Sequence, residues 1–189
     1  MTDQITGSKT KAGAISVNTL VTRADTDSCS GYNLETLLET AEDQGWASGI
    51  VTNTSITHAT PAASYAHSPE RNWESDKDLS AKAKANGCRD IARQLIEFNR
   101  GNGIEVILGG GRKHFLPEAE NGERQDGRNL IEEWLANNKK SVFVSNANQL
   151  NTVDAENTQH LLGVCIILGI VVGNIKEYWI LSAQRFFIF

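Results

Sequence analysis

Cysteine is scarce in this sequence, and a recognisable targeting segment is missing. The cysteines, Cys29, Cys88 and Cys165, number three among 189 residues. They are too few for a disulfide-dense scaffold and lack the spacing of a zinc site, so at most one disulfide can form. The first residues, MTDQITGSKTKAG, include no apolar run. No signal peptide is therefore apparent, and the compartment cannot be read from an address.

An excess of positive charge is also missing. The chain has 18 Lys and Arg residues against 23 Asp and Glu residues, which gives a formal net charge of −5. A general nucleic-acid-binding protein normally shows a basic face, so this balance argues against that class. With 40% hydrophobic and 22% charged residues, the composition indicates a globular protein.

Helix-like and strand-like patterns alternate between about residues 33 and 146. Asn33 is expected to cap a first helix that ends at Gly45. A second helix is expected to carry Ile91, Leu95 and Ile96 and to stop near the Arg100-Gly101 turn. A third is expected to present residues 130–135 along one apolar face, and each helix precedes a strand. The expected strands span Ala47–Thr54, Ile104–Leu108 and Ser141–Val144. This alternation predicts an α/β fold with a parallel sheet covered by helices.

The loop after the first expected strand holds polar residues in the stretch HATPAASYAHSPERNW. Loops at the carboxyl ends of parallel strands build the sites of such folds. Pro61 is expected to keep Thr60 extended, which would direct its hydroxyl toward a hard cation or a hydrogen bond. Arg71 offers a planar fork of donors for phosphate or carboxylate. An ordinary surface loop is the alternative, since these residue types are common on surfaces.

Three glycines, Gly109–Gly111, follow the second expected strand and precede Arg112 and Lys113. The segment lacks the Lys-Ser or Lys-Thr ending of a P-loop and the spacing of a dinucleotide-binding motif. We therefore interpret it as a tight turn at the end of a strand, with Arg112 and Lys113 on the surface.

Several long stretches occur in a telling order: GIVTNTSITHATPAASYAHSPERNWESD, GCRDIARQLI, VILGGGRKHFLP and DGRNLIEEWL. This succession resembles the alkaline phosphatases, and GSKTKAGAISVN is similar to the family's stretch just beyond its nucleophile. The resemblance covers about residues 5–163. It implies part of the family's sandwich, with a mainly parallel central sheet flanked by helices.

The resemblance also implies a chemistry, namely hydrolysis of phosphate monoesters with two zinc ions, one magnesium ion and a transiently phosphorylated serine. Thr60 matches the hydroxyl residue that binds magnesium, and His58 matches a position close to that metal. Arg71 matches the phosphate-binding arginine, whereas His67 matches a position that we interpret as structural. The family further implies a homodimer and an extracellular, cell-surface or periplasmic location.

The sequence departs from the family pattern at both ends. The family's serine precedes the GSKT stretch, where only Met1 to Thr6 stand, and Thr26–Ser28 (TDS) comes too late to replace it. The family's Asp, Glu and His metal ligands would follow Gly163. We therefore predict an internal fragment that has no catalytic residue of its own, binds zinc and magnesium weakly at best and is inactive alone. A non-catalytic phosphate-binding or interaction fragment is the alternative.

Cys88 stands in GCRDIA, where animal members of the family have a disulfide cysteine, and Cys29 lies near the position of its partner. The resemblance thus implies a Cys29–Cys88 disulfide, and free buried thiols are the alternative. A disulfide would indicate an oxidising compartment.

The sequence changes character near its end. Residues 1–163 are expected to form the partial family domain, and residues 164–189 form an apolar tail without the resemblance. The apolar run from Leu161 to Ile175 is shorter than the ~20 residues that cross a bilayer. A frame or splice error in the gene prediction would explain the tail, and a weakly membrane-associating tail is the other interpretation.

Overall fold

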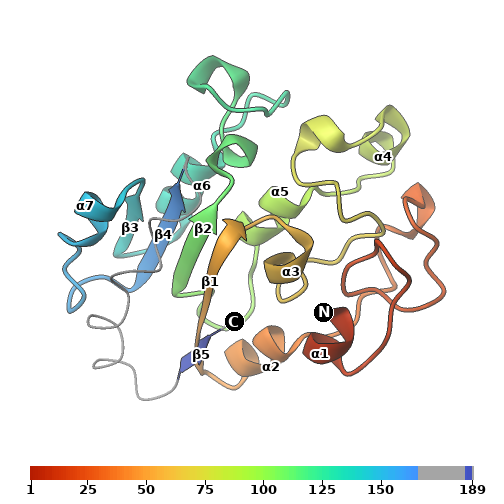
Figure 1. The fold of residues 1–189 in the computed structure, drawn as a ribbon, viewed down its shortest axis with the longest axis horizontal. Coiled ribbons are helices and arrows are strands. Elements are labelled where there is room, and N and C mark those ends of the chain that lie inside the picture. The colour runs from red at the N-terminus through yellow and green to blue at the C-terminus, as the bar shows by residue number, and fades with distance from the viewer. Residues whose placement is uncertain (166–185, 189) are drawn as a thin grey trace.

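A parallel sheet forms the centre of the molecule (Figure 1). The computed structural model describes residues 1–165 and 186–188, so most of the predicted tail lies outside the described residues. Within this part the sheet has five strands in the order β3-β4-β2-β1-β5, and every neighbouring pair is parallel. The strands are β1 (Ala47–Ser55), β2 (Val106–Gly110), β3 (Ser141–Val144), β4 (His160–Cys165) and β5 (Phe186–Ile188).

Short helices connect the strands. The α-helices are α1 (Thr2–Thr6), α2 (Leu37–Asp43), α3 (Ala59–Ala62), α4 (Ala81–Ala85), α5 (Ile91–Ile96), α6 (Leu130–Asn137) and α7 (Ala147–Leu150). Short 3₁₀ turns lie at Thr26–Ser28 (η1), Asp76–Asp78 (η2), Arg112–Phe115 (η3) and Glu118–Glu120 (η4). The predicted α/β fold, with helices flanking a parallel sheet, is confirmed.

Side-chain alternation along the strands divides the core between the two faces of the sheet. Ile50, Ile107 and Leu162 belong to the main hydrophobic cluster, together with buried residues of α2, α5 and α6. Their strand neighbours Leu108 and Leu161 belong to a second cluster, with Leu150 of α7 packed against it. Burial on both faces explains why these strands are apolar throughout and do not alternate with polar residues.

The first predicted helix, which corresponds to α2, begins later than predicted. Thr36, not Asn33, is its N-cap: the Thr36 hydroxyl accepts a hydrogen bond from the Glu39 backbone N–H at 3.1 Å. The Glu39 carboxylate in turn accepts one from the Thr36 N–H at 2.8 Å. This reciprocal capping box satisfies two helix-end donors and outcompetes a single Asn cap. The predicted end is right, since Gly45 takes a positive φ of 73° just past the last turn.

The glycine triplet does more than turn the chain. The second predicted strand, Ile104–Leu108, is displaced by two residues, because β2 runs from Val106 to Gly110. Gly109 and Gly110 are therefore part of β2. A Cβ on Gly109 would lie 2.9 Å from Cγ2 of Thr52, so glycine permits the close approach of β1. Gly111, with φ 87°, makes the predicted turn into η3.

Lys113 lies on the surface as predicted, and Arg112 is only partly exposed there. Arg112 is half-buried, and its guanidinium carbon lies 6.0 Å from the centre of the Phe143 ring, within cation–π range. Lys113 is exposed and its ammonium donates to Glu123 at 2.6 Å. A planar cation can stack on an aromatic ring, and sequence spacing does not show whether a ring is within reach.

Cys29 and Cys88 form a disulfide, with their Cα atoms 5.3 Å apart, as the family resemblance implied. Cys165 is a buried free thiol at the end of β4. Because β4 continues to Cys165, it extends two residues past the predicted domain boundary at 163. The division of the chain there stays a prediction. Across the described residues, no helix is long and apolar enough to span a membrane.

Candidate functional site

The predicted site residues His58 and Thr60 lie at the start of α3, just after the end of β1. His58 is the N-cap of α3, with extended backbone (φ −61°, ψ 147°). Thr60 was expected to be extended because it precedes Pro61, but it lies inside the helix. Pro61 falls in the first turn, where its missing N–H costs no helical hydrogen bond, so the helix tolerates it. The Thr60 side chain is exposed there.

Arg71 reaches the same place from a later loop. Its backbone N–H donates to the carbonyl of Gly13 at 2.7 Å, which ties this loop to the first segment of the chain. Its Nη2 lies 3.2 Å from Nε2 of His58. Because guanidinium can only donate, Nε2 of His58 must accept, and the imidazole proton belongs on Nδ1. That Nδ1 is buried and has no hydrogen-bond partner among the described residues.

In the described part of the chain the guanidinium of Arg71 makes no hydrogen bond or ion pair with a carboxylate, although its charge adds to the hydrogen bond from Arg23 in lowering the pKa of Glu70. Its neighbour Glu70 is instead held by Arg23, whose Nε and Nη2 donate to the two carboxylate oxygens at 2.8 and 3.0 Å. This hydrogen bond from Arg23 is the main reason why the pKa of Glu70 is lowered. Arg23 thus neutralises the nearest carboxylate, and the donors of Arg71 stay available for another anion.

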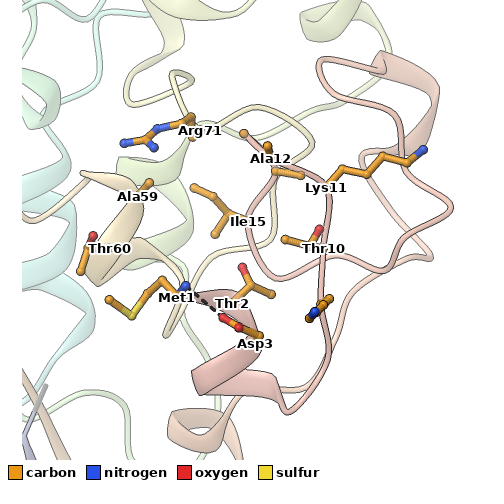
Figure 2. Close-up of a pocket in the computed structure, with 13 residues that line it drawn as sticks. Met1, Thr2, Asp3, Thr10, Lys11, Ala12, Ile15, Ala59, Thr60 and Arg71 are labelled. Atoms are coloured by element: carbon orange, nitrogen blue, oxygen red, sulfur yellow. Dashed lines mark hydrogen bonds and ion pairs between the residues drawn. The ribbon is translucent and has the colours of Figure 1, made fainter.

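A cavity of about 360 Å³ opens beside these groups. Its lining comes from α1, from residues 9–15, and from Ala59, Thr60 and Arg71 (Figure 2). Lys9, Lys11 and Arg71 supply positive charge, although Lys11 points away from Arg71 in Figure 2. The one carboxylate in the lining, Asp3, pairs with the amino group of Met1 at 3.1 Å. The cavity is therefore suited to an anion.

His67 holds the loop that leads to Arg71. Its Nδ1 lies 2.8 Å from the carbonyl of Ser16, and its Nε2 lies 3.1 Å from a carboxylate oxygen of Glu39. Its backbone N–H donates to Gln94 at 2.9 Å. Both ring nitrogens are therefore engaged with the protein, which agrees with the structural interpretation of this residue.

The described residues fit the predicted metals unequally. Zinc needs three or four converging ligands, and no group of three or more His, Cys, Asp or Glu in residues 1–165 and 186–188 could hold a metal ion. Zinc sites therefore do not fit these residues alone. Magnesium prefers about six oxygen ligands, and the exposed Thr60 hydroxyl, which makes no hydrogen bond here, could supply one. The roles assigned to Thr60 and His58 toward magnesium stay predictions.

Three contributors to the site were not foreseen. Gly13 accepts from the Arg71 N–H and allows Arg23 to pass, because a Cβ there would lie 2.5 Å from Nε of Arg23. Arg23 and Lys9 come from the same early segment. No local motif marks these residues: Gly13 and Arg23 act through contacts with Arg71 and Glu70, far along the chain, and Lys9 lines the cavity.

Comparison with known proteins points to one family. The sequence model of the alkaline phosphatase family matches residues 1–166. The chain is 38% identical over 176 residues to an alkaline phosphatase of Gadus morhua, which covers 86% of this chain and 36% of that protein. It is 37% identical to the human tissue-nonspecific isozyme (86% and 33% covered) and 40% identical to a membrane-bound alkaline phosphatase of Bombyx mori (86% and 32%). The chain thus spans about a third of the length of these relatives.

Solved structures of alkaline phosphatases resemble the fold of this chain. The alkaline phosphatase of Thermus thermophilus superposes with a TM-score of 0.61 at 30% identity, over 88% of this chain and 27% of that one. A mutant of the alkaline phosphatase from the Antarctic bacterium TAB5, with magnesium bound, gives a TM-score of 0.64 over 99% of this chain and 47% of that one. At 20% identity, this second likeness shows the fold alone.

Proposed function

The chain belongs to the alkaline phosphatase family, and we propose that its segment from His58 to Arg71 holds the phosphate group of a phosphate monoester for hydrolysis. The observation that carries the proposal is the state of Arg71. Its guanidinium lines a cavity, the neighbouring carboxylate of Glu70 is held by Arg23, and no described acidic residue forms an ion pair with it. A planar fork of donors in this state binds two oxygens of a phosphate group.

In this proposal each side chain has a separate task. Arg71 binds non-bridging phosphate oxygens, and it favours the transition state because charge develops on those oxygens there. His58 keeps Arg71 in place through its Nε2. Thr60 contributes one hydroxyl to a magnesium ion. Metal ions, when bound, would activate the nucleophile and stabilise the leaving oxygen. The zinc ligands and the nucleophile are expected from other parts of a longer protein.

The wider properties of the family are proposals for this protein as well. We propose a homodimer that acts outside the cell, at its surface or in the periplasm. The Cys29–Cys88 disulfide supports an oxidising compartment, and one relative is described as membrane-bound. The net charge of −5 supports small phosphate esters over nucleic acid as the partner.

A chimera tests the proposal directly. Residues 5–163 replace the matching third of the Gadus morhua enzyme, and hydrolysis of an activated phosphate monoester is measured at alkaline pH with zinc and magnesium. We expect turnover, and a decrease of about 100-fold in kcat/KM in the Arg71→Ala chimera, since loss of one transition-state donor typically costs this much. Arg71→Lys should recover part of it, because lysine keeps the charge but loses the fork.

Two controls complete the design. Arg112→Ala removes a half-buried arginine outside the cavity and should leave kcat/KM within about threefold of the parent chimera, since mutations away from a site have small effects. The 189-residue chain is assayed alone beside the chimera, and we expect no turnover above buffer. Equal activity of the Arg71→Ala and parent chimeras would overturn the role of Arg71.

A non-catalytic phosphate-binding fragment is the second candidate. It is favoured by the lack of a three-ligand metal cluster among the described residues. A folded chimera without turnover, together with Arg71-dependent binding of inorganic phosphate to the chain, would support it.

A further inference from the structure

The inference concerns Asn53, a residue of β1 that the proposed function does not use. The whole sequence has a single Asn-x-Ser/Thr triplet with x other than proline, Asn53-Thr54-Ser55. This triplet is the acceptor sequence for N-linked sugar in proteins that enter a eukaryotic secretory pathway. By itself the triplet is a weak signal, because many such triplets are buried after folding.

The structure leaves the Asn53 side chain open. It is exposed, and it makes no hydrogen bond among the described residues. Thr52 and Thr54 bond to each other through their hydroxyls at 2.9 Å, and Thr52 lies against Gly109 of β2. Since side chains alternate along a strand, Asn53 points to the opposite face from these two threonines.

The backbone around Asn53 is also less constrained than the rest of β1. The register with β2 runs from Gly49 to Val51, is interrupted, and resumes at Ser55 opposite Gly110. Among the described residues, pairing with β5 runs from Ala47 to Gly49. Residues 52–54 therefore lie in an irregular stretch of β1.

The disulfide supplies an independent observation about the compartment. Cys29 and Cys88 are joined, and structural disulfides form and persist where the environment is oxidising, as in the lumen of the secretory pathway. That lumen is also where the sugar donor and its transferring enzyme act. The Cys29–Cys88 pair and the Asn53 triplet thus indicate the same route.

We propose that Asn53 is N-glycosylated. Its side-chain nitrogen Nδ2 forms a bond to the anomeric carbon of the first N-acetylglucosamine of a lipid-linked oligosaccharide diphosphate. The bond between that carbon and the diphosphate oxygen breaks, the lipid diphosphate leaves, and one amide proton is lost. The transfer takes place on the unfolded chain, so the strand conformation is no obstacle, and the exposed side chain allows the folded protein to keep the sugar.

The test follows the full 189-residue chain through a eukaryotic secretory pathway, with a cleavable secretion signal placed before Met1. Both secreted and cell-retained protein are digested with a peptide N-glycosidase in heavy-oxygen water, and peptides are mapped by mass. We expect Asn53 to be converted to heavy-oxygen aspartate in both pools. Mobility of the intact protein should increase on a gel after the same digestion.

Matched variants separate glycosylation from spontaneous deamidation. Asn53→Gln and Ser55→Ala should each abolish the mobility change, because they remove the acceptor nitrogen and the required hydroxyl. Ser55→Thr restores a hydroxyl and should keep it. An unmodified Asn53 in both pools overturns the proposal, and so does a sugar confined to retained protein, since that would show that the folded chain excludes it. Neither result bears on phosphate hydrolysis.

Discussion

Two arginine-centred regions of this protein show how a structural arginine differs from the arginine proposed to bind phosphate. Arg124 is 1% exposed, and its guanidinium donates to both carboxylate oxygens of Asp90, to Asp126 and to the carbonyl of His114. Arg71 is half-buried, and among the described residues its guanidinium hydrogen-bonds only to an imidazole nitrogen of His58. The residue type is the same, but the guanidinium N–H groups of Arg124 donate to protein oxygens, whereas those of Arg71 do not.

The carboxylates explain this difference. Asp90 both pairs with Arg124 and caps α5, since its Oδ1 accepts from the Arg93 N–H at 2.8 Å. Burial raises the pKa of Asp90, although Arg124 opposes that effect. Around Arg71 the nearest carboxylate is held by Arg23. The carboxylates around Arg124 are therefore paired with it, whereas the guanidinium of Arg71 is left without an ion pair among the described residues.

Replacement of Arg124 should give the largest effect on stability. Arg124→Met leaves Asp90 buried without its cation, and loss of one partner of a buried ion pair costs about 3–5 kcal/mol in free energy of unfolding. Urea denaturation followed by tryptophan fluorescence measures it. A loss below about 1 kcal/mol would mean that the buried pair contributes no more than a surface one.

The disulfide next to this region should have the second largest effect. Cys88 lies two residues before Asp90, and its link to Cys29 closes a loop with a sequence separation of 59. The double replacement Cys29→Ser and Cys88→Ser should lower the free energy of unfolding by about 2–4 kcal/mol. Chemical reduction of the parent chain must produce the same shift in the urea midpoint. Cys165→Ser, at the free thiol, is the matched control.

Glu42 differs from Asp90 because it is a buried carboxyl that is not paired with an arginine. Burial, with the neighbouring Glu105 adding to it, raises its pKa from 4.5 to about 7, although a hydrogen bond from the Ser48 hydroxyl opposes the shift. A raised pKa means that the folded state holds the proton more tightly than the unfolded state. The contribution of Glu42 to the free energy of unfolding is therefore fully present below pH 4.5 and is lost as the pH rises through about 7.

Glu42→Gln should remove the part of this pH dependence that Glu42 contributes, while the part due to Glu105, whose pKa burial also raises, remains. Glutamine stays neutral and can still accept from the Asn102 N–H, so the variant should gain about 1–3 kcal/mol over the parent chain at pH 8. Thermal unfolding between pH 4 and pH 9 measures the difference. Glu132→Gln, at an exposed position of α6, is the control and should keep the slope. A parent chain with no slope in this range would show that Glu42 ionises normally.

Replacement of Arg71 should have the smallest effect on stability. Because Arg71 makes one contact with His58 and no ion pair in the described part, Arg71→Ala should change the free energy of unfolding by less than about 0.5 kcal/mol. The same denaturation series measures it. A loss comparable with that of Arg124→Met would place Arg71 among the structural arginines and weaken the proposed phosphate site.

Much of the fold could be predicted from local patterns, and the failures have physical reasons. The strand Ser141–Val144 is correct to the residue, since a short apolar run between turns has few alternatives. The cap at Asn33 was wrong because Thr36 and Glu39 form a reciprocal pair that a search for single caps overlooks. Thr60 was placed outside a helix because the rule for residues before proline ignores the first helical turn.

The sequence alone was enough to predict the family and the parallel α/β architecture, because long motifs and strand periodicity are local properties of the chain. The pairing of Cys29 with Cys88 was only implied by the family resemblance, and the structure shows it. The sequence singled out Arg71 through its match to the family, but only the three-dimensional structure shows how Arg71 and Arg124 differ in their partners. Arg124 is paired with Asp90 and Asp126, whereas the guanidinium of Arg71 makes no ion pair with a described carboxylate and Glu70 is held by Arg23. Pairing of charges is settled by distance in space, and the chain brings Arg23 to Glu70 across 47 positions.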